Sequence, residues 1–347
     1  MTQPAFFVVN PCGNAESGVY NRPVLPQPHP QPGSQAVVTT PAQHSFSGHD
    51  TFPFRYAWLK KGVDAVTSDP MVFGRDEAIT VLGVGKNMVR AIRHWCLAAG
   101  LVQETPESRG TSLQVTKLGK RLFADRGFDP YLEDPATLWL LHWQIASNRA
   151  RSTTWFWAFS HFHEPEFSRE AFLQALLRWV PLLGGKAVAE ISVRRDVDCF
   201  FRTYLPSKNL RSKVLEESLD CPFVELSLLR SAPAGQTLSF VLGEKDTLPD
   251  GVLFYATLQY WEQFAGKGNA LSLYDLCRQP GSPGQLFKLD DDSLAARYER
   301  FENTTEGAIV YDETAGLKQL YRRRLVPPSL LLSKAYGKTA SFGGLFA

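Results

Sequence analysis

Two acidic residues, Asp196 and Asp198, lie two positions apart in an arginine-rich stretch, RRDVDCFFRTY. Clustered carboxylates can hold a divalent cation, and neighbouring guanidinium groups can stabilise the charge that develops during phosphodiester hydrolysis. A second acidic stretch, EESLDCPFVEL, adds Glu217 and Asp220 as candidate metal ligands. The two stretches together predict metal-assisted hydrolysis of a nucleic-acid backbone.

The same acidic residues also have structural interpretations. Asp196 and Asp198 can flank the start of a helix. Asp220 stands before Cys221-Pro222, the position of a helix N-cap, with Glu225 in the first turn. The two interpretations differ in whether the acidic stretches meet in space.

His49 is the second candidate for chemistry, in the motif FSGHDTF. A histidine next to an acid, here Asp50, can act as a general base or bind a metal. It can equally be a buried, hydrogen-bonded anchor for the helix that follows. The candidate catalytic residues are therefore His49, Asp196 and Asp198.

Such chemistry needs an element that holds DNA, and residues 76–123 have the pattern of a complete winged helix-turn-helix. Glycines at 83 and 85 allow the positive φ that the turn of this motif needs. The predicted elements are a helix at 77–82, a turn at 83–85, a helix at 86–99, a hairpin with its tip at 104–111 and a helix at 117–123.

The second helix of this motif has a basic face. At about 100° per residue, its polar and cationic side chains fall opposite Val89, Ile92 and Cys96. In a winged helix this helix enters the major groove, where arginine and lysine read guanine and asparagine reads adenine. Winged helices also serve as protein-interaction modules, which is the alternative. The predicted DNA contacts are Lys86, Asn87, Arg90, Arg93, His94, Arg109, Lys117 and Lys120.

The composition limits how DNA can be bound. The chain has 347 residues and a net charge of only +2, so the contacts must come from local basic patches. Five scattered cysteines without a CxxC pair favour reduced thiols over disulfides or zinc. Without a bilayer-spanning apolar run or a secretory signal pattern, a cytoplasmic protein with no membrane partner is expected.

The expected fold is mainly α with small β wings (α+β). Tryptophan at 139, 143, 155, 157 and 179 indicates core packing between helices, with stacking on unpaired bases as the alternative. The second winged-helix-like domain has candidate contacts at Ser282, Gln285, Lys288, Arg297 and Arg300, and its aspartates at 290–292 would repel phosphate unless they cap a helix. The expected domains are a disordered Pro/Gln/Gly-rich arm (1–45), a winged-helix DNA-binding domain (46–128), a helical middle domain (129–250), a winged-helix-like domain (251–330) and a tail (331–347).

Five motifs in this order resemble a family of bacterial proteins encoded beside DNA phosphorothioation genes: FSGHDTFPFRYAWLKK, LGVGKNMVRAIRHW, DPYLEDPATLWLLHW, DVDCFFRTY and EESLDCPFVEL. The resemblance covers about residues 46–324. It implies a DNA-nicking component of the single-strand phosphorothioation (Ssp) defence system, acting with a cysteine desulfurase, an ATPase and a sulfur-inserting enzyme. The resemblance does not identify a catalytic motif in this chain.

The residues and the resemblance together predict a subunit that binds double-stranded DNA and nicks one strand so that sulfur can be introduced. Magnesium, or another divalent cation, would be held by Asp196, Asp198, Glu217 and Asp220, and His49 or a metal-bound water would deliver the attack. A homodimer is compatible with this prediction. The alternatives are a non-catalytic winged-helix adaptor that recruits the sulfur-transfer enzymes, and a transcription regulator.

Overall fold

The computed structural model describes residues 44–185, 187–207, 221–233, 235–264, 266, 268–314 and 316–337. Three predictions lie wholly or partly outside the described residues. They concern the N-terminal arm up to residue 43, the candidate ligands Glu217 and Asp220, and the tail from residue 338. The fold is mainly α-helical with small antiparallel sheets, which confirms the predicted α+β class.

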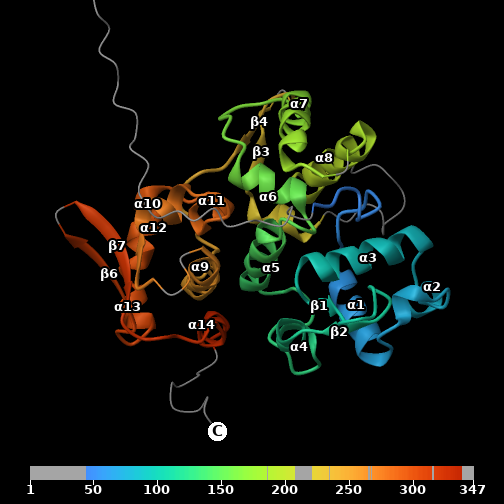
Figure 1. Ribbon diagram of the computed structural model, residues 1–347, viewed down its shortest axis with the longest axis horizontal. Coiled ribbons are helices and arrows are strands. Elements are labelled where there is room, and N and C mark those ends of the chain that lie inside the picture. Colours follow the sequence, from blue (N-terminus) through green and yellow to red (C-terminus); the bar gives the residue numbers. More distant parts are fainter. Residues whose placement is uncertain are drawn as a thin grey trace, which may run out of the picture. The chain divides into compact units, whose positions relative to one another are not determined.

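The first group of elements follows the predicted order closely (Figure 1). Gly83, at φ 64°, ends one helix in the left-handed conformation that glycine adopts readily. The Thr116 side chain caps another helix by accepting a hydrogen bond from the Gly119 N–H at 3.0 Å. The elements are α1 (Tyr56–Ser68), η1 (Val72–Gly74), α2 (Ala78–Leu82), α3 (Lys86–Ala98), the antiparallel pair β1 (Val102–Glu104) and β2 (Leu113–Val115), and α4 (Lys117–Phe123).

The middle group is helical and buries its tryptophans. Trp139, Trp143, Trp155 and Trp157 are all buried, so their predicted role in the core is confirmed. Asp134 begins the first helix by accepting a hydrogen bond from the Ala136 N–H at 2.8 Å. The elements are α5 (Pro135–Ser147), α6 (Thr153–Ser160), α7 (Arg169–Trp179), η2 (Val180–Leu183), α8 (Glu190–Tyr204), η3 (Pro222–Leu226) and the antiparallel pair β3 (Leu229–Ser231) and β4 (Leu238–Phe240).

The last group combines six helices of the described residues with a three-stranded sheet of order β5-β7-β6. The hairpin between β6 and β7 turns at Gly316, at φ 79°, a conformation that glycine adopts readily. The elements are α9 (Asp250–Phe264), β5 (Ala270–Ser272), α10 (Leu273–Arg278), α11 (Pro283–Phe287), α12 (Asp291–Tyr298), α13 (Phe301–Thr304), β6 (Ile309–Thr314), β7 (Leu317–Arg322) and α14 (Pro328–Ala335).

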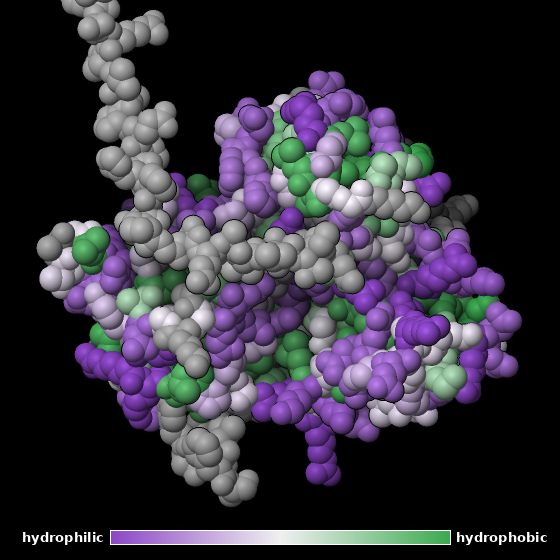
Figure 2. All heavy atoms as spheres, in the orientation of Figure 1, coloured by the Kyte–Doolittle hydropathy of each residue, from purple (hydrophilic) through white to green (hydrophobic). Residues whose placement is uncertain are grey.

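Buried side chains from all three groups belong to one hydrophobic cluster. Phe54 links two of them, because its ring contacts Trp95 of α3 and Phe223 of η3. The domain boundaries at 128, 250 and 330 stay predictions. On the face shown in Figure 2, hydrophilic residues predominate and hydrophobic residues lie in separate groups. Within the described ranges, none of the helices has the length and apolar character needed to cross a membrane.

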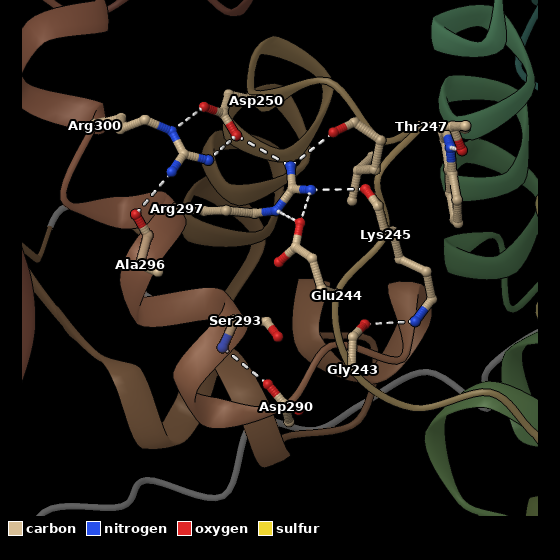
Figure 3. A network of polar contacts seen from close by, with 12 residues as sticks. Gly243, Glu244, Lys245, Thr247, Asp250, Asp290, Ser293, Ala296, Arg297 and Arg300 are labelled. Carbon is tan, nitrogen blue, oxygen red and sulfur yellow. Dashed lines mark hydrogen bonds and ion pairs between the residues drawn. The ribbon is translucent and has the colours of Figure 1, made fainter.

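Arg297 of α12 is the centre of a polar network that fixes the segment before α9 (Figure 3). It is 5% exposed and donates to the Leu248 and Lys245 carbonyls, at 2.6 and 2.7 Å, and to the Glu244 and Asp250 carboxylates. The prediction that Arg297 contacts DNA is therefore wrong, since its guanidinium is used internally.

Two more predicted contacts of this region, Ser282 and Lys288, are also buried. The Lys288 ammonium donates to the Phe159 carbonyl at 2.8 Å. Asp290 caps α12 by accepting a hydrogen bond from the Ser293 N–H at 2.8 Å. Helix capping was the structural role expected of these aspartates as the alternative to repelling phosphate. Structural contacts within the protein therefore explain most of the polar side chains that suggested a second DNA-contacting face.

Candidate functional site

The predicted reading helix, α3, has one polar side exposed to solvent. Lys86, Asn87 and Arg90 are exposed, while Val89 and Ile92 are buried on the other side. No acidic side chain of the described residues forms an ion pair with Lys86, and Arg90 has only a long contact with Asp50, at 3.6 Å. The first half of α3 therefore presents two cations and an amide that can meet a ligand.

His94 is not part of this face, contrary to the helical-wheel prediction. Its side chain is 8% exposed and packs edge-on against His49 and Trp95. Gly48 lies so close that a Cβ there would be 2.5 Å from His94 Nδ1. Burial, followed by the positive charges nearby, lowers the pKa of His94 to about 3, so the ring is neutral. The segment around Gly48 covers this side of α3, which a helical wheel cannot reveal.

Arg93 supports the hairpin and is not free to meet DNA. One guanidinium nitrogen donates to the Gly110 carbonyl at 2.9 Å and lies 3.4 Å from Glu104. Arg151 donates to the same Glu104 carboxylate at 2.8 Å, and its hydrogen bond is the largest cause that lowers the pKa of Glu104. Arg93 is therefore a positioning residue for the β1–β2 hairpin.

The remaining predicted contacts are exposed. Arg109 lies at the hairpin tip with φ 49°, and Lys117 and Lys120 lie on α4. None of the three forms an ion pair with any residue that the structure describes. Their charges are available to an anionic ligand.

His49 and Asp196 come together from positions 147 residues apart in the sequence, and both are buried. His49 Nε2 lies 2.9 Å from Asp196 Oδ1, while Thr154 donates to Oδ2 at 2.8 Å and the Ser47 N–H donates to Oδ1. The Thr51 backbone nitrogen lies 3.1 Å from His49 Nδ1. The carboxylate thus accepts from three donors, two on the segment before α1 and one on α6.

Opposing effects act on the pKa of His49. Burial lowers it, whereas Cys199 and Asp196 raise it, to about 10. The ring stacks on Trp95 with its centroid at 5.8 Å, and Trp155 contacts it edge-on at 5.6 Å. His49 and Asp196 are only 1% and 2% exposed, so a phosphodiester cannot reach them in this conformation. This geometry favours the anchor interpretation of His49 over general-base catalysis.

Asp196 and Asp198, two of the four expected metal ligands, do not point to one site. Residues two positions apart on a helix point about 200° apart around its axis, so Asp196 is buried while Asp198 faces solvent. In the part of the chain that the structure describes, no three His, Cys, Asp or Glu side chains are grouped closely enough to hold a metal ion. The described residues therefore do not fit a magnesium site.

One feature was missed by the motif analysis: a cavity of about 830 Å³ whose lining includes Arg55, Arg169, Arg202 and Arg230. These arginines are spread over the sequence without a common spacing. The only sequence signal was the excess of arginine around the acidic stretch at 194–204.

Comparisons with known proteins give one consistent result. The family described as "Protein of unknown function (DUF4007)" matches residues 46–336. An SspB crystal structure is similar with a TM-score of 0.76 and 31% sequence identity, and a magnesium-bound SspB crystal structure with 0.76 and 32%. Each alignment covers 85% of this chain and 89% of the SspB chain. No curated protein matches the sequence. The chain therefore belongs to the DUF4007 family, and its fold is that of SspB.

Proposed function

We propose that this protein is a DNA-binding subunit of a bacterial DNA phosphorothioation system of the Ssp type. The observation that carries the proposal is the solvent-exposed, largely unpaired set of Lys86, Asn87 and Arg90 on α3. The likeness to SspB supports the choice of system. Its partners would be double-stranded DNA and the other subunits: a cysteine desulfurase, an ATPase and a sulfur-inserting enzyme.

The order of elements around α3 supports a winged helix. α2 and α3 are joined by a glycine-containing turn, and an antiparallel hairpin follows α3. In this motif the first half of the second helix contacts base edges. Lys86 and Asn87 lie there, and the partial positive charge of the helix N-terminus adds to the attraction for phosphate.

Backbone contacts would come from the hairpin tip and α4. Arg109, Lys117 and Lys120 are exposed cations without described acidic partners, which suits them to phosphate. Arg93 would act indirectly, because it fixes the hairpin that carries Arg109. The net charge of +2 means that binding would depend on these few local contacts.

A salt titration tests the proposal. Fluorescence anisotropy with a labelled DNA duplex would compare the wild type with Lys86→Ala/Arg90→Ala. The control is Lys318→Ala/Arg323→Ala, which removes one partly buried and one exposed cation elsewhere. Each phosphate contact contributes about 0.9 to the slope of log affinity against log salt. We expect the α3 variant to bind at least tenfold more weakly, with a slope smaller by up to about 2. Unchanged affinity in this variant would refute the assignment of α3.

Strand nicking is a second candidate function, favoured by one observation: a similar solved structure is a magnesium-bound SspB. Because the described residues do not form a metal site, the test centres on Glu217 and Asp220. Supercoiled plasmid would be incubated with the protein and magnesium, with EDTA as one control and Glu217→Gln/Asp220→Asn as a variant. Nicking that EDTA and this variant both abolish supports an enzyme. DNA binding without cleavage under any metal supports the adaptor.

A further inference from the structure

The cavity of about 830 Å³ is lined by Cys221 and by four separate parts of the fold. They are the segment Phe52–Arg55, the first residue of α7, the end of α8 with the residues after it, and the β3–β4 region (Figure 1). Four arginines contribute to the lining, and none of the lining residues is acidic. Pockets of roughly 300–1,000 Å³ accommodate small organic ligands, so the volume suits one nucleotide-sized group and excludes a duplex.

Each arginine is held in place by a contact that involves no acidic side chain of the described residues. The Arg169 guanidinium lies 4.7 Å from the centre of the Phe201 ring, and that of Arg55 lies 5.3 Å from the Trp58 ring. Stacking of this kind orients a guanidinium without neutralising it.

The other two arginines are held by neutral acceptors. Arg202 donates to the Thr51 carbonyl and to the Asp198 carbonyl, and Arg230 donates to the Ser239 hydroxyl at 2.9 Å. None of the four pocket arginines forms an ion pair with an acidic side chain of the described residues. The pocket therefore has four oriented cations, none of which is ion-paired with a described acidic side chain.

The electrostatic environment favours an anion. Burial is the largest effect on the pKa of Arg169 and lowers it; the charge of Asp198 raises it, and the charge of Arg202 lowers it by less. Like charges that share a partly enclosed space repel each other. A phosphate group relieves this repulsion, and the planar guanidinium matches two phosphate oxygens at once.

We propose that this arginine pocket binds a nucleotide of a single DNA strand, with the phosphate on the arginines and the nucleoside in the remaining volume. The proposal rests on the proposed DNA-binding function and extends it. The pocket is connected to the reading helix, because Asp50 contacts Arg90 of α3 and the lining begins at Phe52. Trp95 of α3 also donates to the Phe52 carbonyl at 2.8 Å.

The test uses the full chain and a fluorescein-labelled oligothymidylate of eight nucleotides. The pocket variant is Arg169→Gln/Arg230→Gln, in which both side chains are exposed at the rim and replaced by polar ones. The matched control is Arg178→Gln/Arg195→Gln, which removes two exposed arginines of α7 and α8 that do not line the cavity. Urea unfolding of each variant verifies that the fold is retained.

We expect the pocket variant to bind the oligonucleotide at least tenfold more weakly, and the control variant to bind within twofold of wild type. The slope of log affinity against log salt should become smaller by about 1.4, since each phosphate contact to single-stranded DNA contributes about 0.7 to it. Wild-type affinity in the pocket variant, or an equal loss in the control, would overturn the proposal. Arg169→Lys/Arg230→Lys should recover part of the affinity, because charge is restored without the planar fork.

Two further experiments distinguish binding of a DNA strand in the pocket from duplex binding at α3 and from binding of a free nucleotide. Duplex affinity should change less than twofold in the pocket variant, whereas Lys86→Ala/Arg90→Ala should weaken duplex binding, so the two proposals fail independently. Competition with thymidine monophosphate identifies the source of the phosphate. Displacement of the oligonucleotide only at a large excess supports a DNA strand. Tight binding of the mononucleotide with no binding of the oligonucleotide would overturn the choice of a strand.

Discussion

Replacement of Asp196 by alanine should destabilise the protein more than it alters any chemistry. The carboxylate accepts hydrogen bonds from His49, at 2.9 Å, from Thr154, at 2.8 Å, and from the Ser47 N–H. With both Asp196 and His49 almost fully buried, the substitution leaves these donors without a partner or access to water.

The expected loss of stability follows from the three donors that lose their acceptor. Removal of one member of a buried charge pair typically costs about 3–5 kcal/mol, and hydrogen bonds to a charged group contribute about 1.5–3 kcal/mol each. These terms overlap, so we expect Asp196→Ala to lower the free energy of unfolding by about 4 kcal/mol. Asp196→Asn retains one carbonyl acceptor and should cost about 2 kcal/mol.

The assay is urea unfolding followed by tryptophan fluorescence, because Trp95 and Trp155 contact His49 directly. The matched control is Asp198→Ala, which removes an exposed carboxylate from the same helix and should stay within about 0.5 kcal/mol of wild type. If Asp196→Ala unfolds at the wild-type urea concentration, or Asp198→Ala loses as much stability, the buried-anchor reasoning is wrong.

Three other substitutions test the packing and charge arguments by the same unfolding assay. Arg297→Met should cost about 3–5 kcal/mol because it leaves the buried Leu248 and Lys245 carbonyls without a donor. The more exposed Arg300→Met should cost at most about 1 kcal/mol, and equal losses would refute this reasoning. Gly62→Ala should destabilise by about 1–3 kcal/mol although alanine favours helices, because its Cβ would lie 2.4 Å from a cysteine sulfur; a gain in stability would show that the contact relaxes freely. Burial lowers the pKa of His142 to about 4, so its contribution to stability is present above pH 6.5 and is lost as the pH falls towards 4. Wild type should therefore lose about 2 kcal/mol more than His142→Gln between pH 7.5 and 5, and equal losses would contradict the shift.

The sequence predicted local features well where one element determines the pattern. The boundaries of α3 follow from the 3.6-residue period and from glycines at both ends, and the exposed positions of Lys86, Asn87 and Arg90 follow from the same period. The helix predicted at 117–123 is also observed, and its cap, Thr116, contacts a residue only three positions away. Such relations depend only on neighbouring residues, so a helical wheel is sufficient to find them.

The sequence failed where a distant segment decides the outcome. His94 belongs to the polar sector of α3, yet the segment around Gly48 covers it. Asp196 and Asp198 are close in sequence, but they point to different sides of the helix. Asp196 is hydrogen-bonded to His49, 147 residues away in the sequence. Pairings of this kind arise from tertiary packing, for which the spacing of residues in a single sequence gives no signal.

The segment from Ser47 to Arg55 connects the three features on which function is proposed to depend. Asp50 contacts Arg90 of the reading helix, His49 is fixed to Asp196 of α8, and Phe52–Arg55 lines the arginine pocket. Loosening of the buried anchor should therefore weaken duplex binding and pocket binding together, although neither buried residue touches DNA. A loss of nicking in Asp196→Ala would then be no evidence for catalysis by Asp196 unless stability and DNA affinity were both retained. Asp196→Asn, with its smaller expected loss of stability, is the better variant for that comparison.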